Sequence, residues 1–141
     1  MPRRLPRSAL VLSVAAIVLA CASTPAPPPL DGTWAITSAT LGGKDLPVTV
    51  FGNSRLQLAA GKYVFQNDTG EYAVIPGTQP AAMEIRGQHG PNAGKTFPAI
   101  FQLQADTLIV CYDLSGAARP KAFASDSGTQ LYLVRYTRST S

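Results

Sequence analysis

Few side chains in this 141-residue chain could do chemistry on a substrate. His89 is the only histidine, and it lies between glycines in a predicted exposed loop, so we expect neither a histidine-rich metal site nor a Ser-His-Asp arrangement. Cys111 lies in an apolar, β-branched stretch that predicts burial as a small hydrophobic residue, which raises the pKa of a thiol. The eight acidic residues are scattered singly, mostly in predicted turns, and no pair with glycosidase spacing is apparent. We therefore expect no enzymatic activity, no metal and no cofactor.

The segment Gly90 to Thr96 ends in Gly-Lys-Thr, like a phosphate-binding loop. The spacing is wrong, because the first glycine of that motif would have to stand where His89 is. The residues that follow, from Phe97, read as a strand and not as the helix whose N-terminus would face a phosphate. The segment is predicted to be a hairpin loop.

The first twenty residues have the layout of a secretory signal. Residues 1–7 are basic, and residues 8–20 form an uncharged apolar run. As a helix, those thirteen residues would cover about 20 Å of a hydrocarbon core that is about 30 Å thick, so a retained membrane-spanning helix is not expected. The sequence predicts export.

The end of this run, Val18-Leu19-Ala20-Cys21, resembles the lipobox of bacterial lipoproteins. The resemblance implies that residues 1–20 are a lipoprotein signal peptide and that acylated Cys21 anchors the chain in a membrane. Ala22 follows the cysteine, which by similarity to enterobacterial sorting implies the cell envelope and the periplasmic face of the outer membrane. The alternative is an ordinary signal peptide cleaved close to Cys21. Residues 21–30 are rich in proline and predict an extended tether.

The charge argues against nucleic acid as a partner. The formal charge is +4, but three of the arginines stand in residues 1–7, and without them nine basic residues face eight acidic ones. A nearly neutral domain lacks the clustered cations that phosphate contacts need.

Residues 31–141 read as one all-β domain. No stretch of ten residues sustains a helical apolar pattern, and short alternating segments are separated by Gly, Pro, Asn and Asp. Eight strands are expected, at Thr33–Ala39, Arg55–Leu58, Lys62–Gln66, Glu71–Ile75, Ala82–Arg86, Phe97–Leu103, Thr107–Tyr112 and Thr129–Arg138. Eight antiparallel strands with tight turns favour an up-and-down barrel, and a two-sheet β-sandwich is the alternative.

The side-chain alternation predicts one apolar interior. It blurs in Thr107–Tyr112 and Leu131–Tyr136, where both faces are apolar or aromatic. We therefore expect the outer side of those strands to be covered by a loop, with the segment Gly116–Ser127 as the candidate.

Four motifs between residues 30 and 138 resemble a lipocalin-like family of small exported bacterial domains that is abundant in planctomycetes. The chain shows an L-x-G-x-W start at Leu30–Trp34, a proline at Pro80 before the strand with Met83-Glu84-Ile85, a hairpin with D-T-L at Asp106–Leu108 followed by Cys111, and R-P-x-x-F-x-S at Arg119–Ser125. The resemblance implies a lipocalin-like barrel and brings no catalytic residue with it.

Two binding hypotheses follow. The first is a non-catalytic binding module for a small apolar ligand, with Trp34 at the closed end of the barrel and Tyr63, Phe65, Tyr72 and Phe101 along the cavity. The second is a protein-interaction or inhibitor domain that acts on an envelope protein through the loop Gly87–Thr96.

Three further residues are predicted to hold the long loop in place. Arg119 is expected to pair with a carboxylate such as Asp106 or Asp113, and Phe123 to help fasten the loop across the barrel. A recognition site at Arg119 and Phe123 is the alternative.

Overall fold

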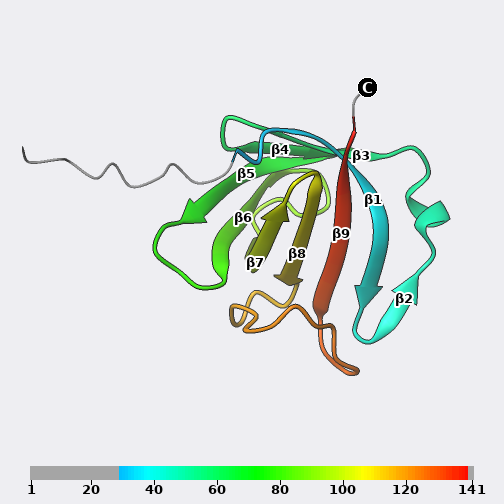
Figure 1. The fold of residues 1–141 in the computed structure, drawn as a ribbon, viewed down its shortest axis with the longest axis vertical. Coiled ribbons are helices and arrows are strands. Elements are labelled where there is room, and N and C mark those ends of the chain that lie inside the picture. The colour runs from blue at the N-terminus through cyan, green and yellow to red at the C-terminus, as the bar shows by residue number, and fades with distance from the viewer. Residues whose placement is uncertain (1–28, 140–141) are drawn as a thin grey trace, which may run out of the picture.

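A computed structural model describes residues 29–139 (Figure 1). The predicted signal peptide, Cys21 and most of the predicted tether lie outside the described residues. The elements are β1 (Gly32–Leu41), β2 (Lys44–Leu46), the 3-10 helix η1 (Val48–Phe51), β3 (Arg55–Ala59), β4 (Lys62–Phe65), β5 (Asp68–Ile75), β6 (Ala81–His89), β7 (Thr96–Gln104), β8 (Thr107–Asp113) and β9 (Leu131–Ser139). Residues 29–139 contain no helix long and apolar enough to cross a membrane.

The strands form one antiparallel sheet that closes on itself. Each strand from β3 to β8 pairs with the next in sequence, and β1 pairs with both β3 and β9. The predicted eight-stranded barrel is confirmed, and the sandwich alternative is wrong because the sheet is single and closed. Closure leaves no free edge among these eight strands.

A ninth strand lies outside the barrel circuit. Lys44–Leu46, which is not among the eight expected strands, pairs as β2 with the end of β1. Two of the predicted boundaries move furthest, by three residues each. Strand β6 continues to His89, and β5 begins at Asp68, so two segments read as loop extend the wall of the barrel.

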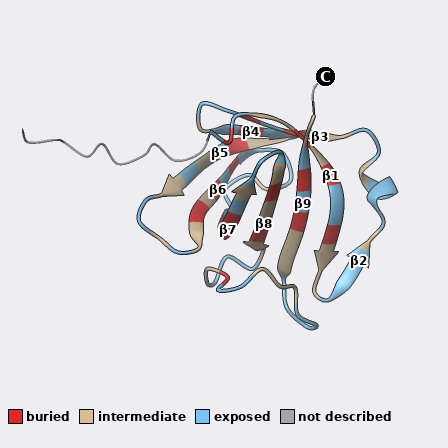
Figure 2. Ribbon diagram, viewed as in Figure 1, coloured by how far each residue is buried: buried red, intermediate tan, exposed pale blue. Residues whose placement is uncertain are grey.

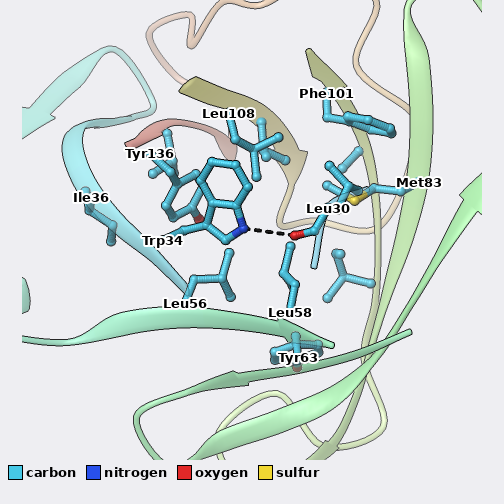
Figure 3. Packing of buried hydrophobic residues seen from close by; sticks show 14 of the residues in the cluster. Leu30, Trp34, Ile36, Leu56, Leu58, Tyr63, Met83, Phe101, Leu108 and Tyr136 are labelled. Atoms are coloured by element: carbon cyan, nitrogen blue, oxygen red, sulfur yellow. Dashed lines mark hydrogen bonds between the residues drawn. The ribbon is translucent and has the colours of Figure 1, made fainter. Parts of the chain in front are cut away.

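One end of the barrel is plugged by the chain that precedes β1. Leu30 is buried, and its carbonyl accepts a hydrogen bond of 3.0 Å from the Nε1–H of Trp34 (Figure 3). The Arg138 guanidinium lies 4.3 Å from the centre of the Trp34 ring and donates to the carbonyl of Asp31. We call this end, where β7 turns into β8, the closed end. The opposite end, where β6 turns into β7, is the open end.

The segment of residues 114–130 runs below β7–β9 in Figure 2. It packs against the outer side of the barrel wall through Phe123 and Arg119, as expected for strands that are apolar on both faces. Phe123 packs against a buried outer cluster of Ala82, Ile100 and Cys111. The Cys111 thiol donates to the carbonyl of Ala124 over 3.4 Å, and burial raises its pKa. Cys111 is thus a packing residue beneath this loop.

The contacts that fasten the loop differ from those predicted. The Arg119 guanidinium donates to the carbonyls of Met83 and Ala99, at 2.9 Å each, and lies 3.5 Å from Glu84. Its predicted partner Asp106 instead lies at the closed end, 3.5 Å from Arg138.

Asp113, the other predicted partner of Arg119, orders the start of the same loop. It accepts hydrogen bonds from the hydroxyl and the backbone N–H of Ser115 and from the N–H of Ala118. Desolvation would raise its pKa, but these donors outweigh it and lower the pKa. The loop is therefore held by a carboxylate at its start and by a guanidinium on strand carbonyls further along.

Replacing Arg119 by lysine should lower the free energy of unfolding by about 1–2 kcal/mol, because an ammonium cannot reproduce both hydrogen bonds to the two carbonyls. Arg86→Lys is the matched control. Arg86 also contacts Glu84, but its side chain is 61% exposed. The Arg86→Lys variant should therefore lose no more than about 0.5 kcal/mol in the free energy of unfolding. Urea denaturation measures both variants, and equal losses would contradict the fastening role of Arg119.

Candidate ligand cavity in the open half of the barrel

The interior is filled at the closed end and hollow toward the open end. The cavity measures about 430 Å³, within the range of small-molecule sites. Its lining combines aromatic residues (Tyr63, Phe65, Phe97, Tyr112, Tyr132 and Tyr136), aliphatic residues and methionine (Ile36, Leu56, Leu58, Met83, Ile85, Leu108, Val110 and Leu114) and four polar residues (Asp68, Asn92, Lys95 and Gln130).

Two of the predicted cavity residues line this space, and two do not. Tyr63 and Phe65 of β4 belong to the lining. Phe101 packs in the buried core near the closed end, and the Tyr72 hydroxyl donates to Asp31 there, so neither lines the cavity. Trp34 sits at the closed end, as expected, and fills it.

A cluster of tyrosines from β8 and β9 forms one wall. The hydroxyls of Tyr112 and Tyr136 lie 3.0 Å apart and share a hydrogen bond, and the rings of Tyr112 and Tyr132 stack with centroids 5.8 Å apart. Burial raises the pKa of all three, that of Tyr132 to about 12. The hydroxyls therefore stay neutral near pH 7 and act as hydrogen-bonding groups. Sequence reasoning missed these residues, although the aromatic run Leu131–Tyr136 was the available signal.

A second wall presents two polar atoms without partners. The Tyr63 hydroxyl and Oδ1 of Asp68 are buried, and neither makes a hydrogen bond within the described residues. Asp68 pairs across the strands with Phe65, which places both on the inner face. Burial raises the pKa of Tyr63 to about 12, and the nearby Asp68 carboxylate adds to this increase through its charge and as a hydrogen-bond acceptor. The two groups are therefore close neighbours, although they do not form a hydrogen bond of regular geometry.

The β6–β7 loop contributes to this wall. The Gly87 N–H donates to the carbonyl of Lys95 and the Gly94 N–H to that of Gly87, both over 2.9 Å, so the loop folds tightly back on itself. This fold places Asn92 and Lys95 on the cavity, where the Asn92 amide donates to Oδ2 of Asp68 over 2.6 Å. No sequence signal pointed to these two residues, since the contact depends on the fold of the loop.

The remaining chemical candidates stand apart from the cavity. His89 is exposed at the end of β6. Residues 29–139 hold no group of three His, Cys, Asp or Glu side chains that could bind a metal ion.

Comparison of the chain with protein-family models, with curated proteins and with solved structures found no match. The chemistry of the cavity lining is therefore the basis for inferring function.

Proposed function

We propose that the protein is a non-catalytic binding module of the cell envelope that holds a small apolar ligand in its barrel. The observation that carries this proposal is the cavity of about 430 Å³ in the open half, whose walls are mostly aromatic and aliphatic. Apolar surface withdrawn from water on binding stabilises a complex by about 25 cal/mol per Å² before the costs of association. The neutral tyrosines add hydrogen-bonding groups that orient a ligand.

The lining supports binding rather than turnover. Acid–base or nucleophilic catalysis needs a reactive group beside an orienting partner. The tyrosines have raised pKa values, so their hydroxyls are poor bases near pH 7. The β6–β7 loop, which is the alternative surface for a protein partner, contributes Asn92 and Lys95 to the cavity, which favours a small ligand.

The proposed anchor fits this arrangement. Acylation at Cys21 and a proline-rich tether would attach the domain through the chain that enters at Leu30. Leu30 lies at the closed end, so the open end would face away from the attachment point. Such a lipoprotein would present its cavity to the surrounding compartment.

The cavity predicts binding of the neutral fluorescent probe N-phenyl-1-naphthylamine. The full chain with Cys21→Ser, which removes the acylation site and the need for detergent, should increase the emission of the probe on titration. Ile85→Trp should weaken binding at least about tenfold, because the added ring occupies the cavity that Ile85 lines.

Val64→Trp is the control, since it adds the same side chain at a position that is 40% exposed. Binding to this variant should stay within about twofold of the parent. A flat titration of the parent, or equal binding to both tryptophan variants, would overturn the proposal.

A further inference from the structure

We propose that the cavity selects an apolar ligand that carries a protonated amine, held at Asp68 and Tyr63. This inference rests on the proposed function and specifies the chemical class of the ligand. The lining places one carboxylate, that of Asp68, on a mostly apolar space.

The Asp68 carboxylate is only partly compensated by the protein. Its Oδ2 accepts from the Asn92 amide, whereas Oδ1 is buried without a hydrogen bond. None of the ion pairs among residues 29–139 includes Asp68. Asp68 is half-buried, but its Oδ1 is shielded from water, and a carboxylate oxygen in that position is normally compensated by a donor or a positive charge.

The hydroxyl of Tyr63 defines the second contact. The residue is only 5% exposed, its oxygen is unpaired, and it lies near enough to Asp68 for the carboxylate to affect its pKa. A hydroxyl oxygen can accept a hydrogen bond, and a carboxylate oxygen can only accept. An ammonium group has three donors and a positive charge, so it can donate to both oxygens and compensate the carboxylate.

The other head groups match less well. An alcohol can donate to Asp68 but leaves its charge uncompensated, and a carboxylate is repelled. Lys95 is the only cation in the lining, and it is exposed, so its charge is screened by water and salt. Asp68 Oδ1 is shielded from solvent, and it therefore dominates the selection of the head group.

Three probes that share a naphthalene ring test this selectivity. They are the amine 2-(1-naphthyl)ethylamine, the alcohol 2-(1-naphthyl)ethanol and the carboxylate 1-naphthaleneacetate. Titration calorimetry of the Cys21→Ser chain at pH 7 should give an affinity for the amine at least about tenfold above that for the alcohol, with the acetate weakest. Equal affinities, or tightest binding of the acetate, would overturn the inference.

Variants assign the preference to the two residues. Asp68→Asn keeps the shape and should remove most of the preference for the amine. Tyr63→Phe should weaken the amine about threefold to tenfold, and it provides a second test if Asp68→Asn disturbs the loop. Asp45→Asn removes an exposed carboxylate of β2 and should leave the preference unchanged. A preference that persists in both cavity variants would place the amine elsewhere.

The neutral probe separates the two proposals. If N-phenyl-1-naphthylamine binds and the naphthyl series shows no preference for the amine, only the amine inference fails. If the neutral probe does not bind, the proposed function fails, whatever the series shows.

Discussion

Replacing Trp34 by alanine is expected to lower the free energy of unfolding by about 3–5 kcal/mol. The indole is fully buried at the closed end, where it packs against the inner faces of several strands (Figure 3). Its loss also removes the hydrogen bond to the Leu30 carbonyl and the ring beneath the Arg138 guanidinium. These contacts hold the N-terminal plug, so its packing should weaken together with the core.

Chemical denaturation measures this loss, and two variants divide it into its causes. Trp34→Phe keeps much of the apolar volume and leaves the Leu30 carbonyl without its donor, so its loss should be about 1–3 kcal/mol. Val50→Ala removes methyl groups from a side chain that is 62% exposed and should change stability by less than about 0.5 kcal/mol. A Trp34→Ala loss no larger than that of Val50→Ala would contradict the plug as a stabilising element.

Most of the barrel could be predicted because its strands alternate cleanly. Leu56 and Leu58 are buried, while the residues between and beside them are exposed, as a wall with one wet face requires. The ninth strand could not be predicted in the same way. Lys44–Leu46 carries no apolar alternation and forms a strand only because the end of β1 extends past β3 and offers it a partner.

The cavity residues were predicted only where they follow from the alternation of inward and outward side chains along a strand. Tyr63 and Phe65 share the inner face of one strand, so the pattern alone placed them inside. Alternation does not decide whether an inward side chain borders a cavity, since Phe101 pairs with the lining residue Val110 and is itself buried in the core outside the lining. Asp68 read as a turn residue, and it faces the ligand space because it pairs with Phe65.

The contacts of Arg119 could not be predicted for a different reason. The positive charge of a guanidinium suggests a carboxylate partner, and Glu84 does lie near that of Arg119. Its shorter contacts are with two strand carbonyls, which every residue possesses and which no side-chain pattern reveals. Contacts to backbone atoms are set by the tertiary fold.

Replacing Gly70 by alanine is expected to lower the free energy of unfolding by at least about 3 kcal/mol, at the upper end of overpacking effects. Gly70 is a buried position in β5, opposite Tyr63 on one side and Gly87 on the other, beside a bulge in the β5–β6 pairing. An added Cβ would collide with the carbonyl oxygen of Arg86 and stand 2.7 Å from Cε1 of Tyr63. The carbonyl belongs to the backbone and cannot move aside cheaply, so the strands themselves must separate.

Gly77→Ala separates the effect of this collision from the free-energy cost of placing a side chain at a positive φ. Gly77 has a positive φ of 77°, but an added Cβ there meets nothing within 4 Å, so its loss should be about 1–2 kcal/mol. Denaturation midpoints compare the two variants, and the neutral probe reports on the cavity. Gly70→Ala should also weaken probe binding, because the displaced Tyr63 ring is part of the lining, whereas Gly77→Ala should not. If both variants lose the same stability and both retain the probe, the close approach of Tyr63 to Gly70 does not shape the cavity.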